Sequence, residues 1–364
     1  MSIVARVRCP TYEAVRAALE RALALLPQDR PLAGRGEPLL LKPNLLAARP
    51  PEAAVTTHPA VVEAALEIAL ELGARPTVAD SPGFGSARRV ARVAGIEAVC
   101  RHYGVPLLDL GHGEAATASG PTYRGLALAR EALEARWLWN LPKWKTHTMM
   151  GLTLGVKNLY GCVPGKRKLA VHFRAGRDAV AFARQLLDLE HLLAPRLTVL
   201  DGVVAMEGPG PGGGTPLKRG LLLASGDAAA LDWEATRLSG FAPGDVPTVA
   251  VSVASGRLVP GDLQVVGDPA PVLPFRPAPG SPCDWPLPGP LRRLAKGLLA
   301  PLPRFAAGVC TGCGVCVEAC PAGALRPGTP PELVRERCLR CYCCQELCPH
   351  GAATVPRRRL GWGR

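Results

Sequence analysis

Eight cysteines near the C-terminus repeat one spacing twice. Each copy reads Cys-x2-Cys-x2-Cys-x3-Cys-Pro, and the two copies begin at Cys310 and Cys338. In bacterial ferredoxins, thiolates at this spacing hold iron-sulfur clusters, and the fourth cysteine of each run binds the other cluster. The pattern therefore predicts two 4Fe-4S clusters with crossed ligand sets. The first set is Cys310, Cys313, Cys316 and Cys348, and the second is Cys338, Cys341, Cys344 and Cys320.

Zinc and disulfides are the alternatives for these cysteines. Paired CxxC motifs also bind zinc, but a zinc site needs only four ligands and gives no reason for a cysteine-proline ending that occurs twice. Disulfides require an oxidising compartment, and nothing in the sequence marks the chain for one. Both alternatives are therefore weaker than the cluster interpretation.

Lysines are scarce in this chain and concentrated in one segment. Only eight of the 43 basic residues are lysines, and five of these eight lie between Lys143 and Lys168. A thermophilic or GC-rich source explains the preference for arginine, so the lysines that remain are informative. Lysine is a compact cation that suits phosphate or carboxylate binding and proton transfer. A basic loop without a ligand is the alternative interpretation.

Lys143, Lys145 and His147 come after the strand predicted at 137–140, and Lys42 and Asn44 lie at the end of the strand predicted at 39–42. Open α/β sheets bind ligands in the crevice at such strand ends. Each of the three asparagines lies close to one of the lysines in the sequence. Thr57 joins them because it precedes a predicted helix, whose free amides attract anions. The predicted anion site comprises Lys42, Asn44, Thr57, Lys143, Lys157 and Asn158. The candidates for proton transfer there are Lys145, His147 and His172. A lone histidine such as His172 is more often a structural hydrogen-bonding residue.

A glycine-rich run over residues 207–215 contains the spacing G-x-G-x-x-G. It leads to another predicted strand and not to a helix, and its prolines remove amide donors, so it does not predict a dinucleotide site. A ligand-binding lid and a plain flexible loop fit the run equally well. Flavin stays an open possibility as a cofactor, because no residue pattern decides it.

The pattern up to residue 267 predicts an α/β domain with a mostly parallel sheet flanked by helices. Short β-type runs alternate there with amphipathic helices. Strands are expected at 3–8, 39–42, 77–80, 105–110, 137–140, 197–203 and 221–225. Helices are expected at 11–26, with Thr11 as cap, and at 59–72, 87–103, 152–160, 177–193 and 228–238. We therefore assign residues 1–267 to an α/β ligand-binding domain.

The remaining residues divide into three predicted parts. Prolines recur so often over 268–304 that this segment is expected to be a stiff linker, with a short basic helix at 291–299. Residues 305–354 form the predicted ferredoxin-like two-cluster α+β domain, and 355–364 form a basic tail.

The formal net charge of +13 falls to about +9 when two clusters of roughly −2 each are counted. Basic surface attracts nucleic acid, acidic proteins or anionic membranes. No nucleic-acid-binding motif accompanies this charge, and no run of about 18 uncharged apolar residues is present. We expect a cytoplasmic protein that has no membrane span and does not bind nucleic acid. Its expected partners are an electron donor or acceptor protein and an anionic small molecule.

Several of these blocks resemble the family called domain of unknown function 362. They are Lys42-Pro-Asn-Leu-Leu46, Thr56-Thr-His-Pro59, Lys143-Trp-Lys-Thr-His147, Lys157-Asn-Leu-Tyr-Gly161, Asp201-Gly-Val-Val-Ala-Met-Glu-Gly-Pro-Gly210, and Asp227 with Asp232. The run Cys341-Tyr-Cys-Cys-Gln-Glu-Leu-Cys-Pro349 is similar to the ferredoxin module often fused to that family. The resemblance implies an iron-sulfur protein whose reaction is generally unassigned. Cys343 fits the module but breaks the ligand spacing, so it is expected not to bind iron.

Three functions fit these features. The leading hypothesis is a ferredoxin-dependent reductase, in which the clusters pass low-potential electrons to an anionic molecule held by the lysines. The second is a non-catalytic electron carrier or assembly factor that docks a redox partner. The third is an anion-binding sensor whose clusters report redox state or oxygen.

Overall fold

The sheet strands of the amino-terminal part are short, mostly apolar runs. Strand β2 reads Pro-Leu-Leu-Leu-Lys-Pro, with only its first residue exposed, as is typical of strands covered on both faces. The strands of the large sheet are β1 (Ser2–Arg8), β2 (Pro38–Pro43), β3 (Arg75–Asp80), β4 (Leu107–Asp109), β7 (Trp137–Leu141), β8 (Lys143–His147), β9 (Gly151–Thr153), β10 (Leu197–Glu207), β11 (Thr215–Ser225) and β12 (Leu263–Gly267). A separate hairpin joins β5 (Ala115–Ala118) and β6 (Leu126–Ala129).

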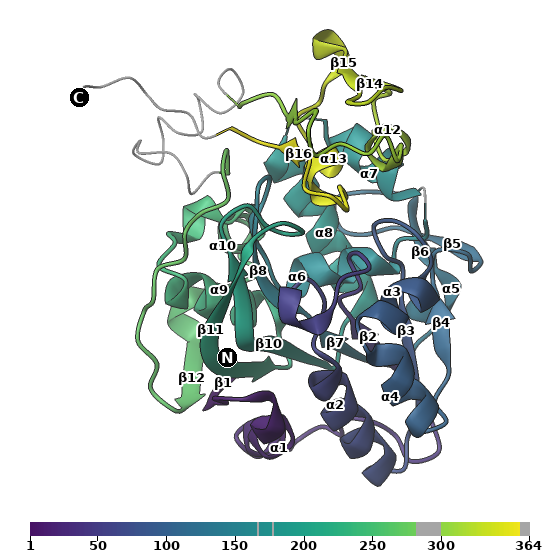
Figure 1. The fold of residues 1–364 in the computed structure, drawn as a ribbon. Coiled ribbons are helices and arrows are strands. Elements are labelled where there is room, and N and C mark those ends of the chain that lie inside the picture. The colour runs from purple at the N-terminus through teal and green to yellow at the C-terminus, as the bar shows by residue number, and fades with distance from the viewer. Residues whose placement is uncertain (166, 177, 282–299, 357–364) are drawn as a thin grey trace.

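These strands form one mixed sheet (Figure 1). The computed structural model describes residues 1–165, 167–176, 178–281 and 300–356. Within them the sheet order is β12-β1-β11-β10-β7-β2-β3-β4, with β8 beside β10 and β9 beside β8. Strands β10, β7, β2, β3 and β4 run parallel, whereas β11 pairs antiparallel with both β1 and β10. The prediction of a mostly parallel sheet is therefore confirmed.

Helices cover both faces of the sheet, because alternate residues of each strand point to opposite sides. One face carries α1 (Val15–Ala24), α2 (Pro59–Glu71), α3 (Ala87–Val93) and α4 (Ile96–His102). The other carries α5 (Arg130–Leu133), α6 (Gly155–Asn158), α7 (Arg167–Ala175), α8 (Ala179–Leu193), α9 (Ala228–Leu238) and α10 (Pro247–Ala254). The expectation of a sheet flanked by helices is confirmed as well.

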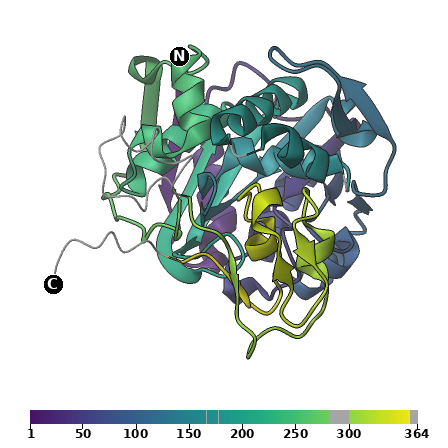
Figure 2. The same ribbon diagram turned by 90° about the horizontal axis from the view of Figure 1, so that it is seen from above.

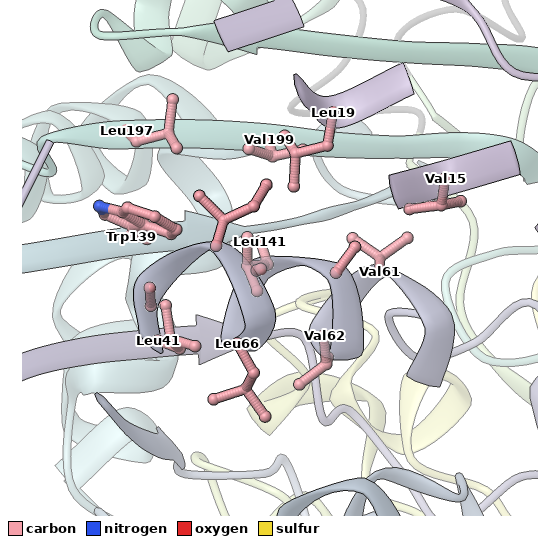
Figure 3. Close-up of a cluster of buried hydrophobic side chains, with 14 of the residues drawn as sticks. Val15, Leu19, Leu41, Val61, Val62, Leu66, Trp139, Leu141, Leu197 and Val199 are labelled. Atoms are coloured by element: carbon pink, nitrogen blue, oxygen red, sulfur yellow. The ribbon is translucent and has the colours of Figure 1, made fainter. Parts of the chain in front are cut away.

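The core beneath α2 shows how the first layer is held (Figure 3). Leu41, Trp139 and Val199 stand on three adjacent strands and belong to the same buried cluster as Leu66 of α2. All four side chains are fully buried. Their burial fixes α2, and with it the loop before this helix, above the carboxyl end of β2.

Several local predictions were wrong. The helix expected at 87–103 is two helices, because Gly95 takes a left-handed conformation (φ +79°) between α3 and α4. The helix expected at 152–160 is interrupted, because 151–153 pair with β8 as strand β9 and α6 spans only Gly155–Asn158. The strand expected at 105–110 is limited to Leu107–Asp109. Thr11 makes no side-chain cap, since a 3-10 turn over Tyr12–Ala14 precedes α1.

The carboxy-terminal module is small and built from short elements, as the ferredoxin-like prediction required. Its elements are β13 (Arg304–Phe305), α12 (Val315–Glu318), β14 (Leu325–Arg326), β15 (Glu332–Leu333), α13 (Cys343–Glu346) and β16 (Ala353–Thr354). Strand β13 pairs with β16, and β14 with β15. Both views place the module beside α7 and α8 (Figures 1 and 2).

The proline-rich segment has no helix or strand at 268–281 or at 300–303, its described residues. The basic helix expected at 291–299 lies outside the described residues, as do residues 357–364 of the basic tail. Across the part of the chain that the structure describes, no helix is long and apolar enough to cross a bilayer.

Replacing Leu66 with Ala should lower the free energy of unfolding by about 2–5 kcal/mol, because a fully packed site collapses poorly around a cavity. Chemical denaturation followed by circular dichroism measures this change. Leu70 on the same helix is 39% exposed, so Leu70→Ala serves as control and should cost no more than about 0.5 kcal/mol. Equal effects of the two substitutions would contradict the packing described for α2.

Candidate redox centre and anion cavity

Two cavities in the carboxy-terminal module are each lined by the four cysteines of one predicted ligand set. The first, of about 220 Å³, is lined by Cys310, Cys313, Cys316 and Cys348. The second, of about 20 Å³, is lined by Cys320, Cys338, Cys341 and Cys344, and also by Cys343. Each group takes three cysteines from one motif and one from the other, which is the crossed arrangement that the spacing predicts.

The donors around these cavities fit iron-sulfur clusters. The four cysteines of each predicted set line one space, and four thiolates are the donor set that a 4Fe-4S cluster requires. Burial, followed by the charge of Cys341, raises the pKa of the Cys344 thiol well above its ordinary value. These sulfurs therefore need strong cationic ligation to remain thiolates. The second cavity is smaller than the first.

A third cavity, of about 90 Å³, lies between the sheet and the cysteine module. Six of the nine predicted site residues line it: Lys42, Asn44, Lys145, Lys157, Asn158 and His172. It is also lined by Asp80, Ser81, Tyr160 and Lys168 from the α/β domain, and by Cys343, Glu346 and Leu347 from the module. We call this space the lysine cavity.

Lys42 is held at the edge of this cavity by an acidic partner. Its Nζ donates to Asp80 Oδ1 at 2.8 Å and to the Pro43 carbonyl at 3.1 Å. The second carboxylate oxygen of Asp80 accepts the Leu45 amide at 2.7 Å. The pair joins the ends of the neighbouring strands β2 and β3, so the charge of Lys42 is already balanced within the protein.

The three asparagines of the chain form one hydrogen-bonded series. Asn44 Nδ2 donates to Asn158 Oδ1 at 2.9 Å, and Asn158 Nδ2 donates to Asn140 Oδ1 at 2.8 Å. Asn140 Nδ2 ends the series on the Gly155 carbonyl at 2.9 Å. An amide both donates and accepts, which allows the series to continue across strands. It fixes α6, and therefore Lys157, against the end of the sheet.

Lys145 and Lys168 differ from Lys42 because their hydrogen-bond partners are neutral oxygens. Lys145 Nζ donates to Asn44 Oδ1 at 2.8 Å and to the Val55 carbonyl at 2.6 Å. Lys168 Nζ donates to the Ser81 carbonyl at 2.6 Å and to Ser81 Oγ at 2.5 Å. Burial lowers the pKa of Lys145 to about 7 and that of Lys168 to about 8. Among the described residues, no carboxylate accepts a hydrogen bond from either of these two lysines of the cavity.

Glu346 brings a carboxylate from the cysteine module into the lysine cavity. Its Oε1 lies 3.9 Å from Lys157 Nζ, and its Oε2 lies 3.4 Å from His147 Nε2. Burial favours the protonated form of Glu346 and so raises its pKa. The interactions with Lys157 and then with His147 outweigh this effect and hold the pKa of Glu346 below its ordinary range. Glu346 and the predicted cluster ligand Cys344 share the short helix α13. This helix joins the second cysteine cavity to the lysine cavity.

The glycine-rich loop between β10 and β11 packs against the same helix. Gln345 Nε2 donates to the Pro209 carbonyl at 2.9 Å, and Thr146 Oγ1 donates to the Gly208 carbonyl at 2.9 Å. A Cβ atom added at Gly212 would lie 2.5 Å from the Glu346 carbonyl oxygen. Glycine is needed at this position because the loop packs tightly between β8 and α13. Pro211, from the same loop, lines the lysine cavity.

Three predicted site residues, Lys143, Thr57 and His147, do not line the lysine cavity. Lys143 Nζ pairs with Asp201 Oδ2 at 2.7 Å and lies 2.9 Å from the Tyr12 hydroxyl, with Lys143 and Asp201 fully buried. Thr57 Oγ1 accepts the Asn44 amide at 2.8 Å and donates to the Leu141 carbonyl. His147 belongs to strand β8, although its segment was predicted as a loop. The sheet requires these residues as internal supports.

The two candidate histidines are neutral near pH 7. His147 Nδ1 accepts the Met149 amide at 3.0 Å and the Met150 amide at 3.2 Å, which leaves the ring proton on Nε2, facing Glu346. His172 stacks on Phe182 with ring centroids 4.4 Å apart. Burial lowers the pKa of both histidines to about 4. Neither is a ready proton donor at neutral pH, whereas the pKa of Lys145 suits proton transfer.

Sequence reasoning missed two residues that shape the site. Glu346 gave no signal because it lies inside the cysteine motif, far along the chain from the lysines. Asp232 was noted only as part of the family resemblance. Its two carboxylate oxygens accept the Gly155 amide at 2.6 Å and the Val156 amide at 3.1 Å. It thereby anchors the start of α6, which carries Lys157.

Fold and cysteine arrangement together define an iron-sulfur protein with an α/β domain and a dicluster module. Residues 309–352 match the 4Fe-4S dicluster domain family, and residues 39–237 match the family described as domain of unknown function DUF362. The chain belongs to the DUF362 family.

A thylakoid-associated protein, sll1697 of Synechocystis, is 40% identical over 255 residues, which cover 70% of this chain and 79% of the relative. Among solved structures, the lactate racemase apoprotein of Thermoanaerobacterium thermosaccharolyticum is similar with a TM-score of 0.44 at 14% identity. That match covers 66% of this chain and 58% of the racemase chain.

Replacing Asp201 with Asn should lower the free energy of unfolding by about 3–5 kcal/mol, because Lys143 would keep a buried charge without its counter-ion. Thermal and chemical denaturation measure the loss. The double variant Asp201→Asn with Lys143→Met should recover part of it, because no unpaired charge remains. If the single and double variants lose the same stability, the ion pair is not the support described above.

Proposed function

We propose that this protein is a reductase in which two 4Fe-4S clusters deliver single electrons to a small organic anion bound in the lysine cavity. The observation that carries the proposal is the position of Cys343. Its side chain lines both the second cysteine cavity and the lysine cavity. A single residue of α13 therefore separates a predicted cluster from the candidate substrate site, and short separations favour electron transfer.

The charged residues that line the lysine cavity support the proposal that its ligand is an anion. The carboxylates that line the cavity, Asp80 and Glu346, already have cationic partners in Lys42 and Lys157. Lys145 and Lys168 donate their hydrogen bonds to neutral oxygens. Two buried ammonium groups without hydrogen-bonded counter-ions are costly, and a bound anion would offset this cost. Leu45, Leu46 and Tyr160 supply apolar walls, so a carboxylate with a short carbon chain suits the space.

Proton supply is assigned to Lys145. Reduction of an organic substrate consumes protons as well as electrons, and the best donor has a pKa near the working pH. Burial lowers the pKa of Lys145 to about 7, which meets this condition, whereas the pKa values of His147 and His172 are too low. When bound, the clusters supply the electrons, and the residues of the α/β domain hold the anion and deliver the proton.

A non-catalytic electron carrier is the second candidate, and one observation favours it. Lys42, Lys143 and Lys157 each have a carboxylate partner within the protein, so much of the predicted anion site stabilises the fold. The relative from Synechocystis is named for its association with thylakoids. A carrier bound at a membrane surface would differ from the cytoplasmic location that we predict. Stable co-purification with a redox enzyme and no turnover of any anion would support the carrier.

Purification under anaerobic conditions and reconstitution should yield about eight iron atoms per chain, with zinc near zero. Iron analysis together with electron paramagnetic resonance of the reduced protein checks the count. Cys344→Ser should lose about half of the iron, because one cluster loses a ligand. Cys343→Ala should keep the full amount, and a loss of iron in this variant would show that Cys343 binds a cluster.

Lys145→Met should weaken anion binding about tenfold or more, since a hydrogen bond to a charged group contributes about 1.5–3 kcal/mol. Calorimetry with acetate, oxalate and succinate measures binding, and cluster spectra should not change. Lys218→Met, at an exposed lysine outside the cavity, is the matched control. Unchanged binding in Lys145→Met would refute the site, and no binding of any anion by the unaltered protein would favour the carrier.

Binding by the unaltered protein should weaken as the pH rises through about 7. Burial lowers the pKa of Lys145 in the empty cavity to that value, so the ammonium form that attracts an anion is lost above it. A bound anion favours the charged form and shifts the midpoint upward. Lys145→Met should lack the loss near pH 7 and retain only a loss near pH 8, where Lys168 loses its proton. An affinity that rises with pH in the unaltered protein would contradict the role of Lys145.

A further inference from the structure

The two cysteine sets differ in exposure. In the first set, Cys313 is exposed and Cys310, Cys316 and Cys348 are partly exposed. In the second set, Cys338, Cys341 and Cys344 are buried, and only Cys320 is partly exposed. A cluster in the first cavity therefore lies near solvent, whereas a cluster in the second is enclosed by protein.

The two sets also differ in their neighbours. The second cysteine cavity borders the lysine cavity through Cys343. The first cavity shares no lining residue with the lysine cavity, and its wall consists entirely of module residues. Helices α12 and α13, which carry Cys316 and Cys344, pack against each other. The second site is therefore the inner end of an electron path, and the first site is its outer end.

Residues 305–317, beside the first cavity, have no charged side chain. Exposed Arg304 and Glu318 flank this range, and Glu318 lines the cavity. Within this range, Ala306, Ala307, Gly308, Val309, Thr311 and Gly312 are exposed together with Cys313. Val309 is 48% exposed, and a Cβ atom added at Gly308 or Gly314 would meet nothing within 4 Å. Small side chains let another molecule approach the cysteines closely.

We propose that residues 306–313 form the docking surface for a small electron-transfer protein that presents its own exposed iron-sulfur cluster. The inference rests on the cluster part of the proposed function and adds the place of electron entry. Electron tunnelling weakens steeply with distance, so the partner must contact the outer site. Because residues 306–313 have no charged side chain, contact there depends mainly on shape and apolar burial. The encounter should therefore depend less on salt than docking through a charged patch would.

Stopped-flow mixing of the reconstituted protein with a reduced bacterial two-cluster ferredoxin tests this surface. Val309→Glu places a charge in the contact and should slow reduction by ferredoxin about tenfold, because that charge would be desolvated on docking. Reduction by dithionite, which needs no protein contact, should keep its rate. Leu70→Glu is the control, since Leu70 is 39% exposed on α2, away from the module (Figure 1).

A second measurement uses the oxidised ferredoxin with the oxidised protein, so that binding is read without electron transfer. Biolayer interferometry should show weaker binding by Val309→Glu and by Ala307→Glu, with iron content and visible spectra unchanged. Wild-type affinity in both variants would overturn the proposal, as would a steep loss of affinity with added salt. Failure of ferredoxin to reduce a protein that dithionite reduces would also overturn it.

The outcomes separate this inference from the proposed reductase. If Lys145→Met leaves anion binding unchanged but Val309→Glu slows reduction, the docking surface holds and the protein is a carrier. If anions bind through Lys145 but Val309→Glu reacts like the unaltered protein, electrons enter elsewhere and the docking surface is wrong.

Discussion

The contact of Glu346 with Lys157 and His147 is the interaction on which the arrangement of the two parts depends. It sets a carboxylate of the cysteine module beside the cation of Lys157 and the neutral ring of His147 at the end of the sheet. Helix α13, which carries Glu346, also carries Cys344, so the position of the predicted inner cluster follows from this contact. The hydrogen bond from Gln345 to Pro209 secures the same helix from its other side.

The positive charges of the buried lysines must be compensated within the protein. Two kinds of partner, carboxylates and neutral hydrogen-bond acceptors, do this. Asp80 and Asp201 neutralise Lys42 and Lys143 directly. Lys145 has only neutral acceptors, which satisfy its hydrogen bonds but leave its charge to be solvated by protein dipoles. This difference separates lysines that support the fold from lysines that remain available to a ligand. Residue type alone does not reveal it, because all of them belong to the same motifs.

Much of the fold follows from local patterns. The buried apolar runs at β2, β3 and β7 and the amphipathic helices α2, α8 and α9 were all predicted close to their observed positions, because burial on a sheet face dictates those patterns. The wrong predictions of helices and strands occur where tertiary contacts override the secondary-structure preference of the local sequence. Lys143–His147 is a polar segment that becomes a buried strand beside β10, and the left-handed Gly95 divides one expected helix into two.

By itself, the sequence predicted an iron-sulfur module, because three of the four predicted ligands of each cluster lie within one short motif. It also determined that lysine and asparagine gather at the ends of sheet strands. Only the tertiary structure decided which of those cations are already neutralised, and that Glu346 reaches them from another module. It also decided which cysteine set faces solvent. Such relations join residues far apart in the chain, so they exist only once the sheet, the glycine-rich loop and α13 have packed together.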